Sequence, residues 1–165
     1  TCMAPSKTFN LAGLAFSNII IRDPQLREIF KNRDKLFGMV NPMSLVAAKA
    51  AYDRGGEWHE ELKIYLDKNF EFVKEYLSTN LPEAVMGISE ATYLAWVDLS
   101  AVLPDVKDLP GFFANNAGVL LEGGNSLFVG NADGYIRLNL AMPQAIIKTG
   151  LERICKSIEE YKNKI

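Results

Sequence analysis

Two cationic side chains, Lys7 and Arg137, have types and settings that suit chemistry. Lys7 lies in the segment APSKTFNLAGL, and after it no charged residue occurs before Arg22. A lysine amine in a partly apolar setting is more readily neutral, and a neutral amine can form a Schiff base with a carbonyl compound. A surface lysine that spreads its stem over apolar neighbours and keeps its charge in water is an equally good interpretation.

Arg137 lies in YIRLNLA (135–141), whose alternation predicts a strand with Tyr135, Arg137 and Asn139 on one face. Arginine is rarely buried without a partner. Taken alone, the position slightly favours an ion pair at a strand edge. The alternative is a carboxylate site, because a guanidinium can donate two parallel hydrogen bonds to a carboxylate. A Schiff-base lysine and a carboxylate-binding arginine are the minimum equipment for amino-acid chemistry on pyridoxal phosphate.

Capping signals and apolar periodicity predict the elements that must position these residues. Asp23-Pro24 predicts a helix start, Gly55-Gly56 a break between two helices, and Pro143 the start of the last helix. The expected strands are 14–21 (buried), 85–99 (a pair) with 93–97 strongest, 119–123 and 135–141. The expected helices are 25–37 with a stop near Gly38, 43–54, 57–80, 105–116 and the segment after Pro143.

These elements predict an α/β fold in which the later part of the chain packs helices on a small sheet. In the last helix the apolar residues step by four and three, which predicts one buried stripe; they are Ile147, Leu151, Ile154, Ile158 and Tyr161. The first forty residues read as one edge of a different lobe, with too few elements to close a core of their own.

Composition narrows the function classes. The chain has 165 residues, a net charge of −2, and 18 Lys and Arg that form no basic patch, so the footprint of nucleic-acid binding is missing. No apolar run is long enough to span a membrane, and the first residues lack the pattern of a signal peptide. We therefore expect a cytoplasmic protein that binds neither nucleic acid nor membrane.

Other reactive residues offer little. His59 is the one histidine and is expected on a helix surface; Cys2 and Cys155 lie far apart and match no metal or redox spacing. We expect no metal site. The glycine-rich segment 123–134 lacks the pattern of a phosphate-binding loop and is interpreted as a strand connection.

The segment SKTFNLAGL resembles the cofactor-lysine segment of fold-type I pyridoxal-phosphate enzymes. More narrowly, the chain resembles the MalY/PatB-type C–S lyases (cystathionine β-lyases) within class I/II aminotransferases. Three further segments agree in order and spacing, so that the resemblance covers nearly the whole chain; they are NPMSLVAAKAAYDRGGEWHEEL, ATYLAWVDLS and GVLLEGGNSLFVGNADGYIRLNLAMP.

The resemblance implies roles for individual residues. Lys7 would carry pyridoxal 5′-phosphate as a Schiff base and would also remove the substrate Cα proton. Ser6 would lie near the cofactor phosphate, and Asn41 would approach the active site of a partner subunit in a homodimer. Arg137 would bind the substrate α-carboxylate. Tyr93 and Trp96 belong to the YLAW strand, where substrate contact and core packing explain them equally well.

The implied reaction is α,β-elimination of cystathionine or a related cysteine S-conjugate to pyruvate, ammonia and a thiol. An aminotransferase of the same fold is the alternative, and a non-catalytic binding or regulatory module is a further one. Aminotransferases often carry a hydroxyl residue and an arginine for the phosphate where this chain has Ala4 and Ala15. That difference favours the lyase branch and leaves phosphate binding partly unassigned.

The resemblance also implies that the chain is the C-terminal portion of such an enzyme. The expected division is residues 1–42 as the remnant of the large cofactor-binding domain, 43–80 as inter-domain helices and 81–165 as the small domain. The family's cofactor-stacking aromatic residue and pyridine-pairing aspartate precede the lysine. The segment by itself is therefore expected to bind the cofactor poorly or not at all and to be inactive.

Overall fold

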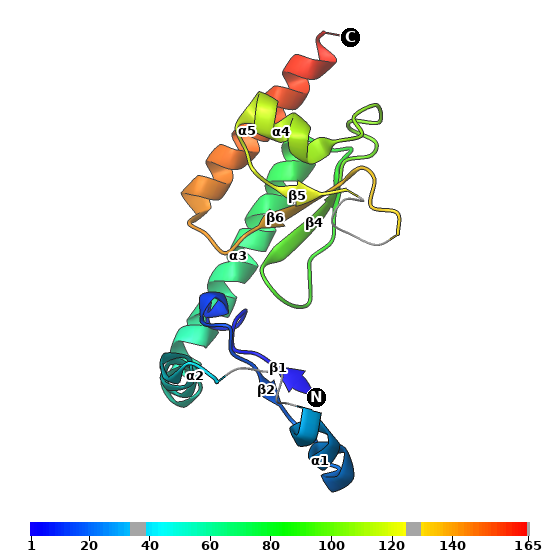
Figure 1. The fold of residues 1–165 in the computed structure, drawn as a ribbon. Coiled ribbons are helices and arrows are strands. Elements are labelled where there is room, and N and C mark those ends of the chain that lie inside the picture. The colour runs from blue at the N-terminus through cyan, green and yellow to red at the C-terminus, as the bar shows by residue number, and fades with distance from the viewer. Residues whose placement is uncertain (34–38, 125–129, 165) are drawn as a thin grey trace. The chain divides into compact units, whose positions relative to one another are not determined.

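The computed structural model describes residues 1–33, 39–124 and 130–164 and has the mixed α/β composition that the sequence predicts (Figure 1). The chain divides into two compact units: unit 1 is Thr1–Lys63 and unit 2 is Ile64–Ile165. The boundary lies within one long helix, α3, to which both units contribute. The sequence-based division at residues 42 and 80 stays a prediction.

The described residues of unit 1 form two very short strands, a 3-10 turn and three helical segments. They are β1 (Cys2–Met3), the 3-10 turn Ala12–Leu14, β2 (Asn18–Ile19), α1 (Pro24–Arg33), α2 (Pro42–Arg54) and the first part of α3 (Gly56–Asn80). Among the described residues of this unit, only Pro5, Ser44 and Ala48 are buried. Unit 1 therefore has almost no core of its own, as the sequence predicted for its first forty residues.

The buried strand expected over 14–21 is wrong. The extended pairing is limited to β2, and Ile19 and Ile20 remain 48% and 49% exposed. The reason is that, among the described residues, β2 pairs only with β1, in an antiparallel two-stranded sheet. β-Branched residues favour strands when a second layer covers them, and a two-residue pairing supplies no such layer.

The helix boundaries of unit 1 follow local capping chemistry. The Asp23 carboxylate accepts from the backbone N–H of Gln25 (2.7 Å) and Leu26 (2.9 Å), so that α1 begins where the Asp-Pro pair predicts. The Asn41 side chain caps α2 in the same way by accepting from Met43 (2.9 Å). The helix stop expected near Gly38 lies outside the described residues.

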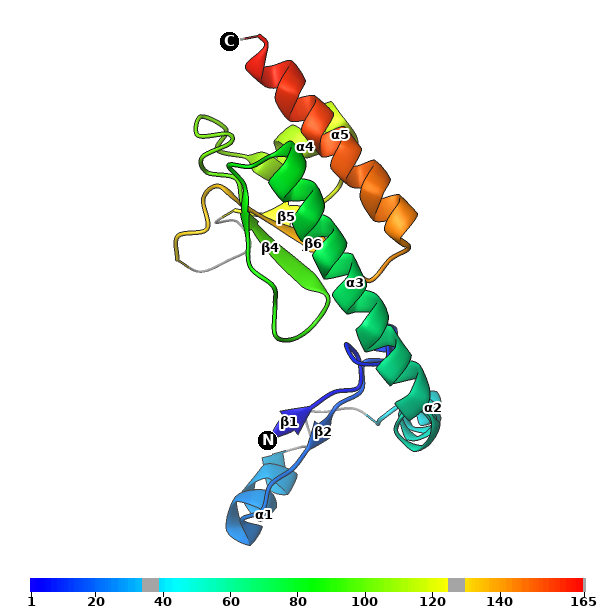
Figure 2. The ribbon, with the colours of Figure 1, turned by 180° about the vertical axis from the view of Figure 1, so that it is seen from behind.

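Unit 2 is a four-stranded antiparallel sheet with helices on one face. Its strands are β3 (Val85–Met86), β4 (Leu94–Asp98), β5 (Glu122–Gly123) and β6 (Tyr135–Asn139), in the order β3-β4-β6-β5. Its further helices are α4 (Leu109–Ala117) and α5 (Gln144–Lys162). Seen from behind, α3 and α5 run across the same face of the sheet (Figure 2).

The core of unit 2 lies between the sheet and these helices. Strands β4 and β6 contribute Ala95, Val97 and Ile136, each at most 2% exposed. The predicted stripe on α5 is buried at Ile147, Leu151, Ile154 and Ile158, and Tyr161 is partly buried against the core. Because the helices cover one face only, β4 and β6 turn their alternate side chains away from the core.

Candidate active site

Lys7 lies in a helix-like turn whose backbone is closed by two hydrogen bonds. The N–H of Phe9 donates to Pro5 O (2.9 Å), and the N–H of Leu11 donates to Ser6 O (3.0 Å). The second bond requires a left-handed residue just before Leu11, and Asn10 adopts φ 54° there. Asparagine tolerates this conformation better than most residues. The turn is therefore held by local sequence chemistry.

The Lys7 side chain is exposed, whereas Pro5 is buried and Ser6 and Thr8 are half-buried. Within the described ranges, the Lys7 amine makes no hydrogen bond or ion pair. The turn thus holds a primary amine in the open, with a hydroxyl side chain on either side of it in sequence.

Two other residues of unit 1 that the sequence singled out, His59 and Asn41, have defined contacts. His59 is half-buried and not on an open helix surface, because its ring lies 5.8 Å from the ring of Phe9. The oxygen of the Asn41 side chain is engaged as the cap of α2. A cofactor role for Asn41 stays a prediction.

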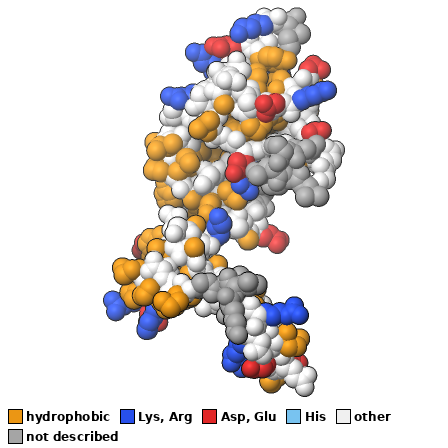
Figure 3. Space-filling model, in the orientation of Figure 1, with side chains coloured by type: hydrophobic (Ala, Val, Ile, Leu, Met, Phe, Trp, Pro, Cys, Tyr) orange, Lys and Arg blue, Asp and Glu red, His pale blue; other side chains and the backbone are white. Residues whose placement is uncertain are grey.

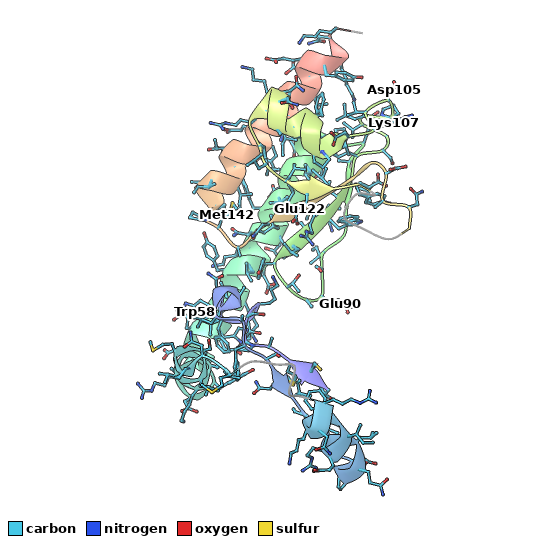
Figure 4. The ribbon with its side chains drawn as sticks, viewed as in Figure 1. Trp58, Glu90, Asp105, Lys107, Glu122 and Met142 are labelled. Carbon is cyan, nitrogen blue, oxygen red and sulfur yellow. The ribbon has the colours of Figure 1, made fainter. Side chains whose placement is uncertain are left out.

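Arg137 lies in the middle of β6 on the face of the sheet that the helices leave open. Its register partners are Trp96 on β4 and Glu122 on β5. The guanidinium forms an ion pair with the Glu122 carboxylate, and the two side chains are 28% and 52% exposed. Figure 4 marks Glu122 at this edge of the sheet. The ion pair that the strand position alone favoured is therefore present.

A stacked aromatic pair lies beside Arg137 on the same face. The rings of Trp96 and Tyr135 are 5.3 Å apart and nearly parallel, at 15°. Tyr135 and Arg137 share this face, as the alternation of YIRLN predicted. The sequence named Trp96 as a possible substrate contact but did not place it beside Arg137, and it did not indicate Glu122 at all. The antiparallel register of LAWVD against YIRLN is the signal that places Trp96 there.

Asp98 closes one end of this face. Its carboxylate accepts from the Ser100 hydroxyl (2.6 Å) and the Ser100 N–H (2.8 Å), and it also binds the Tyr135 hydroxyl. Burial alone would raise the pKa of Asp98, but the hydrogen bonds outweigh it and the pKa is lowered. The same bond raises the pKa of Tyr135, because ionisation would place a second negative charge beside the carboxylate.

Tyr93 lies just before β4, and its backbone contacts the residue that follows β6, since Tyr93 O accepts from the N–H of Leu140 (2.8 Å). By strand alternation, Tyr93 is on the same side of the strand as Ala95 and Val97, which face the core. Arg137 pairs with Trp96, which is on the opposite, open face. The sheet therefore brings Trp96, and not the Tyr93 side chain, directly opposite Arg137. A substrate role for Tyr93 stays a prediction.

Two hollows have other linings. One, of about 800 Å³, lies in unit 1 beside α1 and the segment 20–23 that precedes it, and the other, of about 360 Å³, lies in unit 2 around Ser100, Lys107 and Asp133. Lys107 belongs to the loop after β4, near Asp105 (Figure 4). Neither hollow is lined by a predicted site residue. Among the described residues, no cluster of His, Cys, Asp and Glu could hold a metal ion, and no helix could span a membrane.

Comparison with known proteins identifies the enzymes that this chain resembles. No family model matches the chain. The chain is 40% identical over 157 residues to cystathionine beta-lyase PatB of Bacillus subtilis, covering 93% of the chain and 40% of that protein. The structure of a PLP-bound C–S lyase from Staphylococcus hominis superposes with a TM-score of 0.89 at 45% identity, over 96% of this chain and 40% of that one.

An aminotransferase also matches nearly the whole of this chain. LL-diaminopimelate aminotransferase of Natranaerobius thermophilus is 26% identical over 157 residues, which is 92% of this chain and 38% of that protein. The chain spans about two fifths of the length of the curated relatives it matches. In sequence and fold, the chain is therefore similar to the MalY/PatB-type fold-type I pyridoxal-phosphate enzymes over that part of their length.

Proposed function

We propose that this chain is the part of a pyridoxal-phosphate-dependent C–S β-lyase that carries the cofactor lysine and the substrate-carboxylate arginine. The observation that carries the proposal is the setting of Lys7, an exposed amine on a turn closed by two backbone hydrogen bonds. The similarity to PatB and to the C–S lyase of Staphylococcus hominis supports it.

The residues present fit pyridoxal 5′-phosphate in their chemistry. The Lys7 amine can form a Schiff base with the cofactor aldehyde, and Ser6 can donate a hydrogen bond to the phosphate. Asn41 and Tyr93 are the further proposed contacts, to cofactor and substrate respectively. When bound, the cofactor supplies an electron sink for the carbanion that forms at the substrate Cα.

The chain's own residues divide the remaining work. Arg137 binds the substrate α-carboxylate through its guanidinium fork and thereby orients the amino acid. Lys7 Nζ receives the proton that leaves Cα. The Cβ–S bond would then break, and the sulfur would leave as a thiol by taking up the proton that Lys7 accepted. Water hydrolyses the remaining aminoacrylate to pyruvate and ammonia, which balances the reaction for cystathionine or another cysteine S-conjugate.

The surface of unit 1 supports a larger parent enzyme. Hydrophobic side chains gather over α2 (Figure 3), where Met43, Leu45, Val46 and Tyr52 are 48–67% exposed. Exposed apolar patches of this kind mark surfaces that other chain segments or subunits cover. We propose that residues 1–42 belong to a large cofactor-binding domain, 43–80 to inter-domain helices and 81–165 to a small domain.

We also propose that the parent enzyme is a cytoplasmic homodimer. Cys2 and Cys155 are both free thiols, which is the usual state in a reducing compartment. Sedimentation of the full-length enzyme tests the dimer directly. A monomer that retains full activity would contradict it.

The decisive test uses the full-length enzyme and L-cystathionine. We expect equal amounts of pyruvate and free thiol, and loss of at least a thousandfold in kcat in Lys7→Ala, because the proton acceptor and the cofactor link are removed together. Unchanged turnover in Lys7→Ala contradicts the proposal. The Lys49→Ala variant is the matched control, since Lys49 is exposed on α2 and pairs only with Asp53 within the described residues.

An aminotransferase is the second candidate, and the similarity to LL-diaminopimelate aminotransferase favours it. Transfer of the amino group to a keto acid without release of thiol would establish it in place of the lyase. The third candidate, a non-catalytic binding module, predicts that Lys7→Ala leaves the biological function of the protein intact.

A further inference from the structure

The segment after Lys7 is fastened to α2 and α3 by the Phe9 ring. This ring lies 6.0 Å from the ring of Tyr52 near the end of α2, and 6.1 Å from the ring of Trp58 and 5.8 Å from that of His59 at the start of α3. The Tyr52 contact is edge-on and the Trp58 contact is stacked. Both arrangements are favourable for aromatic pairs. Figure 4 marks Trp58 at this helix start.

The junction of α2 and α3 has room for the ring because residue 55 is a glycine. A Cβ on Gly55 would lie 2.6 Å from Phe9 Cε1 and 2.5 Å from Ala51 O, both closer than a carbon atom can approach. A Cβ on the neighbouring Gly56 would meet nothing within 4 Å. Of the two glycines, only Gly55 therefore makes room for the Phe9 ring, and we call this space the notch at Gly55. The Gly-Gly pair thus both separates the two helices and admits the ring.

A second tether holds the same segment. The hydroxyl of Ser44 donates to Leu14 O (2.7 Å), and Ser44 is only 1% exposed although it lies on α2. The chain from Phe9 to Leu14 is thus attached to α2 at both of its ends. The lysine turn is joined directly to this fastened stretch.

Because Phe9 and Lys7 belong to the same turn, the position of the Phe9 ring determines the direction in which the Lys7 side chain points. Successive residues of a helical turn are rotated by about 100°, so that residues two apart point about 200° away from each other. Burial agrees with this, since Phe9 is half-buried against the helices and Lys7 is exposed. A ring seated on the helix junction therefore directs the amine to the opposite side.

We propose that Phe9, seated in the notch at Gly55, is the positioning residue for the Lys7 amine. The inference rests on the proposed function, because it takes Lys7 as the residue that holds the cofactor and accepts the Cα proton. In this proposal Phe9 contacts neither the cofactor nor the substrate and acts on the Lys7 amine through the turn. Displacing a catalytic amine by about 1 Å lowers the reaction rate on the order of a hundredfold.

The test compares Phe9→Leu, Phe9→Ala and Gly55→Ala with the matched control Gly56→Ala in the full-length enzyme. Pyridoxal phosphate is added, borohydride fixes the adduct, and peptide mapping by mass spectrometry gives the share of label on Lys7 relative to all other lysines. We expect this share to fall severalfold in Phe9→Ala and Gly55→Ala, to fall less in Phe9→Leu, and to stay unchanged in Gly56→Ala.

Steady-state kinetics provide the second measurement. We expect kcat to fall about 10–100-fold in Phe9→Ala with a much smaller change in KM, because Arg137, and not Lys7, holds the substrate carboxylate. Phe9→Leu, which keeps most of the apolar volume, should recover part of kcat. It also keeps the proposal testable if Gly55→Ala fails to fold.

The outcomes distinguish a failure of the proposed function from a failure of the positioning role of Phe9. No label on Lys7 in the unsubstituted enzyme overturns the proposed function. Full label on Lys7 and an unchanged kcat in a folded Phe9→Ala overturn the positioning role alone. A parallel loss in Gly56→Ala also overturns it, since that substitution leaves the notch intact.

Discussion

Arg137 and Glu122 lie opposite each other on β6 and β5 and form an ion pair across the two strands. The pair occupies the guanidinium that we propose as the substrate-carboxylate site. A substrate carboxylate must therefore share or replace the Glu122 carboxylate. Because both side chains are partly exposed, the pair contributes little to folding, about 0.2–1 kcal/mol.

Glu122→Gln should lower KM for an amino-acid substrate of the full-length enzyme by about two- to fivefold, with little change in kcat. The physical reason is that the competing internal charge is removed while the side-chain shape is kept. Arg137→Lys serves as the control and should raise KM, because an ammonium cannot form the two-bond fork. A raised KM in Glu122→Gln would instead identify Glu122 as a residue that orients Arg137.

Asn69 on α3 connects the helix to the end of β6 inside the core of unit 2. Its amide donates to Leu140 O (2.8 Å) and Met142 O (3.1 Å), and the side chain is 1% exposed. Asn69→Leu should lower the free energy of unfolding by roughly 1–3 kcal/mol, because buried carbonyl groups lose their donor. Urea denaturation measures this.

The control for Asn69 is Asn116→Leu. Asn116 donates to Phe112 O (2.8 Å) at an exposed position on α4, where water can replace the lost bond. We expect a change below about 0.5 kcal/mol there. An equal loss of unfolding free energy in the two variants would mean that burial does not increase the contribution of the Asn69 hydrogen bonds to stability.

The Asp98–Tyr135 bond makes the stability of unit 2 depend on pH at both ends of the scale. The pKa of Asp98 is lowered, so its contribution is full above the ordinary value of 3.8 and is lost as the pH falls through the lower folded-state pKa. The pKa of Tyr135 is raised, so its contribution is full below the ordinary value of 10.0 and is lost as the pH rises through the higher folded-state pKa.

Asp98→Asn should flatten this dependence in both the acid and the alkaline range, as measured by urea midpoints across pH. Tyr135→Phe should flatten the alkaline range and raise the pKa of Asp98, since one of its hydrogen bonds is removed. A wild-type acid dependence that persists in Asp98→Asn would assign it to other carboxylates.

Gly134 lets the chain approach β4 closely. It has φ +81°, and a Cβ there would lie 2.7 Å from the Ser100 Cβ. Gly134→Ala should therefore lower stability by about 1–2 kcal/mol for the left-handed backbone and by about 1–3 kcal/mol more for the clash. Gly124→Ala is the control, because Gly124 has φ +68° with nothing within 4 Å. Equal thermal destabilisation of both would exclude the clash.

Local sequence chemistry was enough to predict several elements of this fold. The Asp-Pro pair begins α1, and the Gly-Gly pair separates α2 from α3. The buried stripe of α5 also follows from spacing alone. These features depend on contacts within about four residues, which a sequence pattern contains in full.

Strand alternation also predicted the shared face of Arg137 and Tyr135, whereas the roles that residue type and neighbours suggest for Lys7 and Arg137 stay predictions. Only the tertiary structure placed Glu122 and Trp96 on either side of Arg137, seated Phe9 in the notch at Gly55, and left β2 without a covering layer. Each of these joins residues far apart in the chain. Such pairings depend on strand register and on which surfaces meet, and these are decided when the whole chain packs.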